Sequence, residues 1–460
     1  MLKTLTSLSL CLFTLGALGQ VKKIPAKTTT PIKTTQVPTF EPVINDVPVK
    51  QYEGLSAGTL APDVVIVDAD YIEGIINGAV IVRKGKLTAL VDLKGKYIVP
   101  YGKYNIREFY YFLPVFTPLI AMEDPTTGLK GFINVNGQIV IRPIYDRIED
   151  FDYSLMAMVS LPKIGFNQRY IDLKGNLISP LMEKIYDKSI VERTLIGNKQ
   201  ADLFRYVNQK IGYITRKGTI AIVPQFDNGN YFVEGLAAVA KTDQFGEKKW
   251  GYIDETGKTI IPFMFGREPG YFHEGLALVR PSTPTTFNYA YIDKKGNIKH
   301  KIGDGKYSRY TPYENTGSRA NLLKVDSKMG GNFINGYSFW TNGREPFLMD
   351  TLGNFKSLSS IIKGVSPSDK REVFLDQYDD RGIFFGYGGP GSMSANTGVM
   401  DYQGNILIPP VFNQVYLDYY SRYAHVKLEN FNIKNAAHKY DGIVNPQGVF
   451  VMIVGDKPTF

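Results

Sequence analysis

Two short runs of β-branched and aromatic residues, separated by a polar turn, recur along most of this chain. The clearest copy is residues 250–262, which read Trp-Gly-Tyr-Ile-Asp-Glu-Thr-Gly-Lys-Thr-Ile-Ile-Pro. Strands favour β-branched and aromatic residues, and turns favour Asp and Gly, so this segment predicts a β-hairpin. Because an isolated hairpin is only marginally stable, we expect the copies to cover one another's apolar faces.

Nine copies of this unit align on one glycine. These anchor glycines are Gly95, Gly137, Gly175, Gly218, Gly257, Gly296, Gly353, Gly404 and Gly448. They are 38 to 57 residues apart, and most separations are near forty. Six copies have an aspartate three residues before the anchor: Asp92, Asp172, Asp254, Asp293, Asp350 and Asp401. The other three copies have Asn134, Thr215 and Asn445 at this position.

The Asp-x-x-Gly segment is interpreted as a structural turn. An Asp side chain accepts a backbone hydrogen bond two residues further on, which starts a turn. Glycine at the third loop position supplies the left-handed conformation of a type I turn with a G1 bulge. Because Asn and Thr replace Asp in three copies, we do not interpret the acid as catalytic or calcium-binding. The proline that follows most anchors is expected to end the second strand or to lie on an unpaired edge.

A second recurring element adds strands to the unit. Residues 232–239 (Phe-Val-Glu-Gly-Leu-Ala-Ala-Val) match residues 272–279 (Phe-His-Glu-Gly-Leu-Ala-Leu-Val). This element predicts a turn and a third strand, in which Glu234 and Glu274 bond to local backbone. Small residues six positions before the anchor, such as Gly251, suggest close backbone approach where units stack.

Units of about forty residues with three or four strands fit two all-β architectures. The first is an open solenoid or superhelix of tandem β-hairpin repeats, and the alternative is a closed or partly closed β-propeller. We expect the open form, because it accommodates more easily the two inserts, at about 300–346 and 361–394. Contact between the first and last units would instead indicate the propeller.

The chain before the repeats has three predicted parts. Residues 1–19 have the short basic start, apolar run and small residues of a signal peptide, with cleavage near Gly19/Gln20. Residues 20–48 are rich in Pro, Thr and Lys, which predicts a solvated linker. Residues 49–88 are expected to form an N-terminal capping unit, and residues 89–460 the repeat domain.

Composition limits the chemistry that the mature chain can perform. The only cysteine, Cys11, lies in the predicted signal peptide, so the mature chain has no disulfide or thiolate. The formal charge of +9 is spread along the chain and selects no specific nucleic acid, glycan or lipid. No other apolar stretch is long enough to span a membrane. We therefore expect an exported monomer, periplasmic or extracellular.

No catalytic, cofactor-binding or metal-binding residues are predicted. The four histidines lack metal-ligand spacing, and no serine lies in a nucleophile-elbow motif. The glycine-rich segment 386–391 lacks the Lys-Ser/Thr of a phosphate-binding loop. Tyrosines beside basic residues or glycines in the inserts are candidate partner contacts: Tyr307, Tyr310, Tyr313 and Tyr387.

At these residues the chain resembles the WG-repeat family of bacterial proteins. Its pattern, G-[YF]-I-D-x-x-G-x-x-x-I-x-P preceded by F-x-E-G-L-A-x-V, resembles residues 89–453. The full Trp-Gly pair occurs only at residues 250–251, and other copies have Lys130, Ile211, Tyr289 or Thr397 in the Trp position. The resemblance implies a β-rich repeat scaffold without catalytic residues.

Three functions remain open from the sequence. The first is an exported non-catalytic scaffold that binds a protein or glycan partner through the inserts. The second is a secreted polysaccharide-active enzyme, which would need two carboxylates about 5–10 Å apart in an aromatic cleft. The third is a purely structural component of the cell envelope.

Overall fold

The computed structural model describes most of the chain beyond the predicted linker. The described residues are 52, 54–106, 119–151, 155–162, 168–178, 203–215, 217–280, 289–303, 308–309, 331–342, 345–364, 373–379, 381–387, 396–418, 421–429 and 439–455. Residues 42–460 form one compact unit. The predicted signal peptide and linker lie outside the described residues.

The described residues form nine sheets, numbered here in chain order. Sheet 1 consists of β2 (Tyr71–Ile76), β3 (Ala79–Lys84), β4 (Leu87–Asp92) and β5 (Tyr97–Val99). Sheet 2 consists of β6 (Asn105–Ile106), β7 (Leu119–Glu123), β8 (Lys130–Asn134) and β9 (Ile139–Tyr145). Sheet 3 consists of β10 (Arg147–Ile148), β11 (Ala157–Ser160) and β12 (Gln168–Ile171). Sheet 4 consists of β13 (Leu203–Asn208), β14 (Lys210–Thr215) and β15 (Ile220–Phe226). Sheet 5 consists of β16 (Asn228–Gly229), β17 (Leu236–Thr242), β18 (Lys248–Asp254) and β19 (Thr259–Phe265). Sheet 6 consists of β20 (Leu276–Val279), β21 (Tyr289–Asp293) and β22 (Ile298–Ile302).

The last three sheets include the segments predicted as inserts. Sheet 7 consists of β23 (Ser308–Arg309), β24 (Tyr337–Thr341), β25 (Pro346–Asp350) and β26 (Phe355–Ser357). Sheet 8 consists of β27 (Val373–Asp379), β28 (Gly382–Tyr387), β29 (Thr397–Met400) and β30 (Ile406–Phe412). A short helix, α3 (Leu358–Ile361), lies between them in the chain. Sheet 9 is β31 (Gln414–Leu417), β32 (Ala424–Glu429), β33 (Lys439–Val444), β34 (Phe450–Val454) and β1 (Leu60–Val67).

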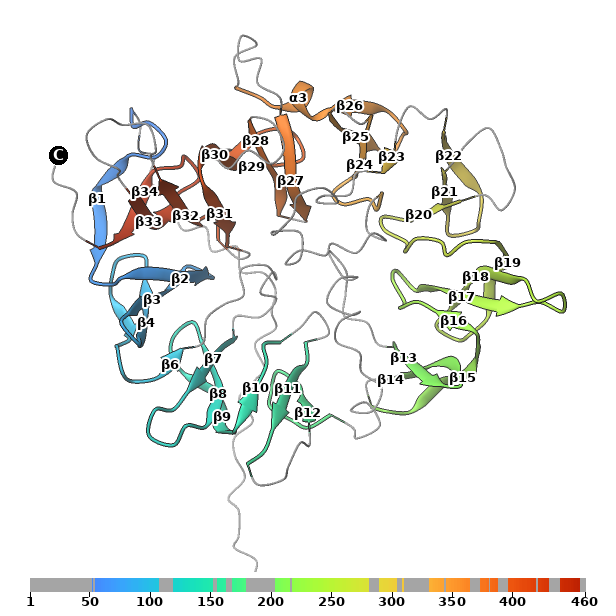
Figure 1. Cartoon of the computed structure of the whole chain (residues 1–460), viewed down its shortest axis with the longest axis horizontal. Helices are drawn as coiled ribbons and strands as arrows, with labels where there is room; N and C mark the ends of the chain where they lie inside the picture. Colours follow the sequence, from blue (N-terminus) through green and yellow to red (C-terminus); the bar gives the residue numbers. More distant parts are fainter. Residues whose placement is uncertain are drawn as a thin grey trace, which may run out of the picture. The chain divides into compact units, whose positions relative to one another are not determined.

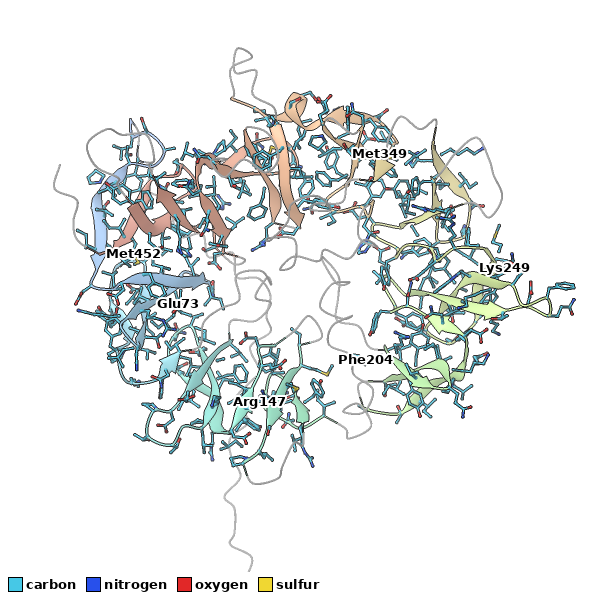
Figure 2. The ribbon with its side chains drawn as sticks, viewed as in Figure 1. Glu73, Arg147, Phe204, Lys249, Met349 and Met452 are labelled. Atoms are coloured by element: carbon cyan, nitrogen blue, oxygen red, sulfur yellow. The ribbon has the colours of Figure 1, made fainter. Side chains whose placement is uncertain are left out.

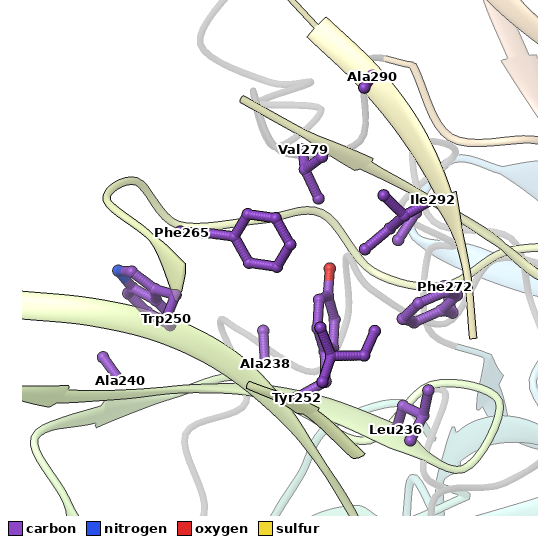
Figure 3. Close-up of a cluster of buried hydrophobic side chains, with 12 residues drawn as sticks. Leu236, Ala238, Ala240, Trp250, Tyr252, Phe265, Phe272, Val279, Ala290 and Ile292 are labelled. Atoms are coloured by element: carbon purple, nitrogen blue, oxygen red, sulfur yellow. The ribbon is translucent and has the colours of Figure 1, made fainter. Parts of the chain in front are cut away.

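The nine sheets follow one another in a closed ring (Figure 1). Side chains fill the interfaces between successive sheets (Figure 2). One such interface, between sheets 5 and 6, contains Trp250, Tyr252 and Phe272 (Figure 3). Within each sheet, consecutive strands are antiparallel neighbours, as hairpin repeats require.

The ring closes where the first sheet meets the last. Val80 and Val91 of sheet 1 share a buried apolar cluster with Ile443 and Met452 of sheet 9. In addition, β1 pairs in parallel with β34 and becomes the outermost strand of sheet 9. The expected open solenoid is therefore wrong, and the alternative, a β-propeller, is confirmed. Closure buries the apolar faces that an open array would leave exposed at its two ends.

The predicted capping segment and inserts supply regular strands of the ring. Residues 49–88 contribute β1 to sheet 9 and the strands β2 and β3 to sheet 1. The insert at 300–346 contains β24, and the insert at 361–394 contains β27 and β28. The longer separations between anchors thus still contain strands of the ring, which is why these inserts are compatible with closure.

The turn at Asp254 shows how the anchor glycines work. Gly257 has φ +86° and donates its N–H to the carbonyl of Asp254 at 2.9 Å. Oδ1 of Asp254 accepts the backbone N–H groups of Thr256 and Lys258, both at 3.0 Å. A Cβ on Gly257 would lie 3.3 Å from Ile222 of the preceding sheet. The anchor therefore supplies both a left-handed conformation and close packing between sheets.

The small residue six positions before the anchor has a different role from the one predicted. A Cβ on Gly251 would lie 2.6 Å from the carbonyl oxygen of Ile261 and 2.9 Å from backbone atoms of Pro262. Both belong to β19 of the same sheet, so the close approach lies within a unit and not between units. The pairing register of β18 and β19 shifts there, which indicates a β-bulge. Pro262 lies inside this outermost strand and does not end it.

A tyrosine five residues before the anchor links neighbouring sheets. Tyr252 donates its hydroxyl to the carbonyl of Gly270 at 2.7 Å, and its ring meets Phe272 edge-on with centroids 4.9 Å apart. Burial raises the pKa of Tyr252 well above its ordinary value, so the hydroxyl remains a donor. The same pair of contacts joins Tyr213 to the carbonyl of Asn230 and to Phe232. It recurs from Tyr291 to Gly331 and Phe333.

Removing one of these hydroxyls should weaken the ring measurably. We expect Tyr252→Phe to lower the free energy of unfolding by about 1–2 kcal/mol, because the partly buried carbonyl of Gly270 loses its donor. Urea unfolding followed by tryptophan fluorescence measures this change. Phe132 occupies the equivalent position in sheet 2, and its ring centroid lies 4.9 Å from that of Phe151. A phenyl side chain without the hydroxyl is therefore compatible with the fold at this position. An unchanged stability would show that the hydroxyl contributes nothing.

Candidate functional site: the turn face

Two sets of turns lie at the same end of the ring. We name the strands of a four-stranded sheet A to D from the centre outward. By position relative to the anchor turn, the described strands are A to C in sheet 3 and B to D in sheets 4 and 6, and β1 lies outside strand D of sheet 9. Because consecutive strands are antiparallel, the A–B and C–D turns share one end and the B–C turn lies at the other. Lys294, in the C–D turn of sheet 6, contacts Glu234, in the A–B turn of sheet 5, with Nζ 3.1 Å from Oε2. We call this end the turn face.

Four of the A–B turns have the same two-residue conformation. Both central residues have positive φ in each, as type I′ hairpin turns require. The pairs are Asn77–Gly78, Glu234–Gly235, Glu274–Gly275 and Asn335–Gly336. In this conformation the two central N–H groups are available to an acceptor from a neighbouring sheet.

Carboxylates of the preceding sheet accept these N–H groups. Glu234 accepts those of Glu274 and Gly275, at 2.5 and 3.0 Å. Glu274 in turn accepts the N–H of Gly336 through both carboxylate oxygens, at 3.0 and 2.8 Å. The prediction that Glu234 and Glu274 bond to local backbone is therefore wrong. They bind the next sheet, so they form a chain of contacts and not a catalytic pair.

The same type of contact occurs at the closure of the ring. Asp418 of sheet 9 accepts the N–H groups of Asn77 and Gly78 of sheet 1, both at 3.0 Å. These residues are 341 and 340 positions from Asp418 in the chain. Asp441 of sheet 9 also accepts the N–H of Ile72 at 3.1 Å. We call these contacts, with those of Glu234 and Glu274, the carboxylate clamps.

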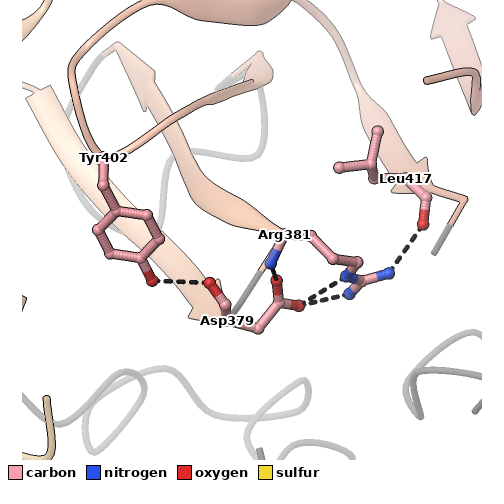
Figure 4. A network of polar contacts seen from close by, with 4 residues as sticks. All are labelled: Asp379, Arg381, Tyr402 and Leu417. Atoms are coloured by element: carbon pink, nitrogen blue, oxygen red, sulfur yellow. Dashed lines mark hydrogen bonds and ion pairs between the residues drawn. The ribbon is translucent and has the colours of Figure 1, made fainter. Parts of the chain in front are cut away.

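Sheets 8 and 9 are joined on the turn face by an arginine. Asp379 accepts hydrogen bonds from Arg381, and Arg381 donates through Nη1 to the carbonyl of Leu417 at 2.8 Å (Figure 4). Tyr402, in the C–D turn of sheet 8, donates its hydroxyl to the carbonyl of Asp379 at 2.7 Å (Figure 4). Asp379, like Glu234 and Glu274, therefore takes part in contacts that stabilise the fold.

Protonation of a clamp should destabilise the ring. Burial tends to raise the pKa of Glu234, but the N–H of Gly275 and the Lys294 ammonium outweigh it and lower the pKa below 4.5. Because the folded-state pKa is depressed, the carboxylate stabilises the fold fully above its unfolded pKa. That stabilisation is lost as the pH falls through the folded-state pKa.

We therefore expect Glu234→Gln to show a pH-dependent defect. At pH 7 the variant should lose about 1–3 kcal/mol of unfolding free energy, because the N–H groups of Glu274 and Gly275 lose a charged acceptor. The difference from the wild type should shrink as the pH falls from 5 to 3, in urea titrations at each pH. Glu255→Gln, an exposed acid in the C–D turn of the same sheet, is the matched control. A pH-independent difference would contradict the assignment.

The described histidines serve as structural groups. His425 is buried, and its Nε2 lies 2.6 Å from Oδ1 of Asp441, within the ring closure. Nε2 of His300 lies 2.8 Å from the carbonyl of Thr351 in the C–D turn of sheet 7. Burial lowers the pKa of His273 to about 4, so this ring is neutral at physiological pH. His438 lies outside the described residues.

Metal and membrane sites are not found in the part of the chain that the structure describes. No group of three or more His, Cys, Asp or Glu side chains there is placed to hold a metal ion. Three acids near the N-terminal end of the ring, which are close in sequence, have separate partners: Asp63 accepts the hydroxyl of Tyr52, Asp68 pairs with Lys84, and Asp70 accepts the N–H of Gly85. No helix among the described residues has the length and apolar composition to span a membrane.

The exposed charge on the turn face is mostly basic over four consecutive sheets. C–D turns of sheets 3 to 6 present exposed lysines: Lys174, Lys217, Lys258, Lys294 and Lys295. Glu255 is an exposed acid on these turns. The corresponding positions of sheets 7 to 9 carry residues such as Leu352, Gln403 and Gln447.

The predicted partner contacts cannot be assigned to this face. Tyr307, Tyr310 and Tyr313 lie outside the described residues. Tyr387 ends β28, and only its backbone is described. The sequence-based prediction missed the lysines of the turn face, although their fixed positions next to the anchor glycines were a usable signal.

Together these features define a closed, nine-sheet β-propeller, and its described residues hold no metal-binding cluster. Four segments match the family described as "WG containing repeat": residues 131–161, 211–244, 250–280 and 398–430. These four matches support the assignment of the chain's repeats to the WG-repeat family. A comparison with curated proteins finds no match.

Solved structures share only a distant similarity with the chain. The structure described as "Crystal structure of the eukaryotic initiation factor" has 10% identity and a TM-score of 0.31, with 82% of this chain and 96% of that chain covered. The β-propeller domain of the Trilobed protease from Pyrococcus furiosus has 13% identity and a TM-score of 0.28, with 74% and 99% covered. Virginiamycin B lyase from Staphylococcus aureus has 14% identity and a TM-score of 0.25, with 56% and 81% covered.

Proposed function

We propose that this protein is an exported, non-catalytic scaffold that binds a protein or glycan partner on its turn face. The repeats and the propeller fold indicate a binding or structural role. One observation supports the proposal above the others: the recurring acids of the turn face are bound to backbone N–H groups, and the lysines beside them are exposed. These carboxylates hold turns and join neighbouring sheets, which supports a scaffold role for them.

Export is the second part of the proposal. It is supported by the basic start, apolar run and small residues of positions 1–19. Cell fractionation followed by mass spectrometry tests it: the protein outside the cytoplasm should begin at Gln20. Recovery of an uncleaved chain in the cytoplasm would contradict export and leave the binding proposal to its own test.

The absence of cysteine from the predicted mature chain allows a direct test of the binding face. Glu255→Cys places a single thiol on the turn face, and Gln244→Cys places one on the B–C turn of the same sheet, at the opposite end. Each variant is coupled to a bulky polyethylene glycol maleimide and screened on a glycan array and against envelope protein fractions.

The two labelled variants should differ. We expect the label at position 255 to abolish partner binding and the label at position 244 to leave binding intact. Equal binding by both labelled variants would place the partner elsewhere and overturn the proposal. Release of new reducing ends from a bound glycan would show an enzyme and would also overturn it.

A further inference from the structure

Sheets 3 to 6 carry exposed lysines on the turn face. These lysines lie next to or one residue from the anchor glycines, so the repeat places one basic tip on each of four consecutive sheets. Lys294 is already engaged, because its ammonium contacts both the carbonyl and the carboxylate of Glu234. Lys174, Lys217, Lys258 and Lys295 remain as the basic row.

The acids beside this row are held in their own turns. Asp172, Asp254 and Asp293 each accept two backbone N–H groups through Oδ1, at 2.9 to 3.0 Å. A hydrogen bond from Asn297, with backbone N–H groups and Lys299, lowers the pKa of Asp293 to about 2. These carboxylates are directed into the turns, whereas the lysine side chains extend into solvent. The row therefore presents net positive charge to a partner.

The basic row is the longest run of consecutive sheets with a lysine beside the anchor glycine. Sheet 1 also has Lys94 directly before its anchor, whereas sheet 2 has Asn136 there. In sheets 7, 8 and 9 the residue directly before the anchor glycine is Leu352, Gln403 or Gln447. In sheets 3, 4 and 6 it is Lys174, Lys217 or Lys295, and in sheet 5 the lysine directly follows the anchor. A charge that served only solubility would not need this arrangement. Sheets 3 to 6 follow one another along an arc of the ring, so an extended partner can contact their lysines one after another.

The spacing of the row selects among anionic polymers. Neighbouring packed sheets lie about 10 Å apart, so the backbone positions of successive lysines are separated by about this distance. Each strand of B-DNA carries one phosphate per about 3.4 Å of helix axis, which is a denser row of charge than the lysines provide. A polysaccharide that carries one carboxylate per disaccharide has charges with wider spacing. Each lysine is solvent-exposed, so a single contact is weak, and binding depends on several contacts made together.

We infer that the turn face binds an acidic polysaccharide with widely spaced carboxylates, along Lys174, Lys217, Lys258 and Lys295. This inference rests on the proposed function and names the partner class for the same face. The lysines act as separate point charges for carboxylates, and the tips of four sheets set the register.

The test uses the chain from Gln20 and four labelled polymers. Hyaluronate has one carboxylate per disaccharide, dextran is neutral, polygalacturonate has one carboxylate per sugar, and double-stranded DNA is the dense polyanion. Fluorescence anisotropy at 50 and 200 mM NaCl measures affinity for each. We expect hyaluronate to bind at least tenfold more tightly than dextran and DNA, and to lose at least tenfold in affinity at the higher salt concentration.

Two fourfold variants with equal charge change identify the surface. The first replaces the basic row by glutamine: Lys174→Gln, Lys217→Gln, Lys258→Gln and Lys295→Gln. The control replaces four lysines at the opposite end of the ring: Lys86→Gln, Lys103→Gln, Lys248→Gln and Lys249→Gln. We expect the first variant to lose at least tenfold in hyaluronate affinity and the control to lose less than threefold. Circular dichroism and melting temperature confirm that both variants are folded.

Several outcomes would overturn the inference. Equal losses in both variants would indicate non-specific charge attraction. Tighter binding of DNA than of hyaluronate at equal salt would contradict the spacing argument. A further outcome is that the partner found is a neutral glycan or a protein whose binding is blocked by the label at position 255. If the first fourfold variant binds that partner with unchanged affinity, this inference fails while the proposed function stands. If the label at position 255 blocks no partner, the proposed function fails as well.

Discussion

Replacing Gly251 by alanine is expected to lower the free energy of unfolding by about 3 kcal/mol or more. The new Cβ would lie 2.6 Å from the carbonyl oxygen of Ile261 and 2.9 Å from the carbonyl carbon and oxygen of Pro262. All three are backbone atoms of the bulge in β19, so the clash cannot be relieved by rotating a side chain. Urea unfolding followed by the fluorescence of the adjacent Trp250 measures the loss.

Gly246→Ala is the matched control for this prediction. Gly246 lies at the B–C turn of the same sheet and has φ +82°, and a Cβ added to it would meet no other atom within 4 Å. Alanine there incurs only the cost of the left-handed conformation, about 1 kcal/mol. If both variants lose the same stability, close backbone approach is not what requires glycine at position 251.

The local structure of this fold could be predicted because its signals are local. The turn at Asp254 and Gly257 needs an acceptor side chain and a left-handed residue three positions apart, and both are visible in the sequence. The strands on either side follow from β-branched and aromatic residues. The repeat multiplies this signal, so the three or four strands per unit could be predicted even where copies diverge.

The closure of the ring could not be predicted from the same signals. It depends on contacts such as that of Asp418 with Asn77, across 341 residues. It also depends on the small rotation between successive sheets, which no single residue encodes. The inserts suggested an open array because the longer separations between anchor glycines were interpreted as segments outside the repeat. In the fold, β27 and β28 of sheet 8 come from one of these inserts.

The candidate site was predicted less well than the turns. The role of Glu234 depends on the next sheet, whose A–B turn presents two N–H groups to it. The sequence places Glu234 and Gly275 forty-one residues apart, and only the packing of sheets shows that they meet. The lysines beside the anchors were visible, but their common face requires the knowledge that every C–D turn lies at one end.

Removing β1 is expected to be the most damaging truncation of the folded chain. A protein that begins at Asp70 lacks the strand whose Leu60–Val67 backbone pairs with β34, and it exposes that edge. It also lacks Ala61 and Val67, which are each 3% exposed in the ring. We expect the melting temperature to fall by about 10 °C, a loss of several kcal/mol for a protein of this size. The exposed edge should also promote self-association.

A protein that begins at Lys50 is the control, since it retains β1 and lacks the predicted signal peptide and linker. Differential scanning calorimetry and size-exclusion chromatography compare the two proteins. If they melt together as monomers, β1 does not hold the ring closed, and the apolar contacts between sheets 1 and 9 or the clamps of Asp418 and Asp441 do so. The double variant Asp418→Asn, Asp441→Asn then becomes the decisive one. Its carboxamides accept fewer and weaker hydrogen bonds from the N–H groups of Ile72 and of the first A–B turn.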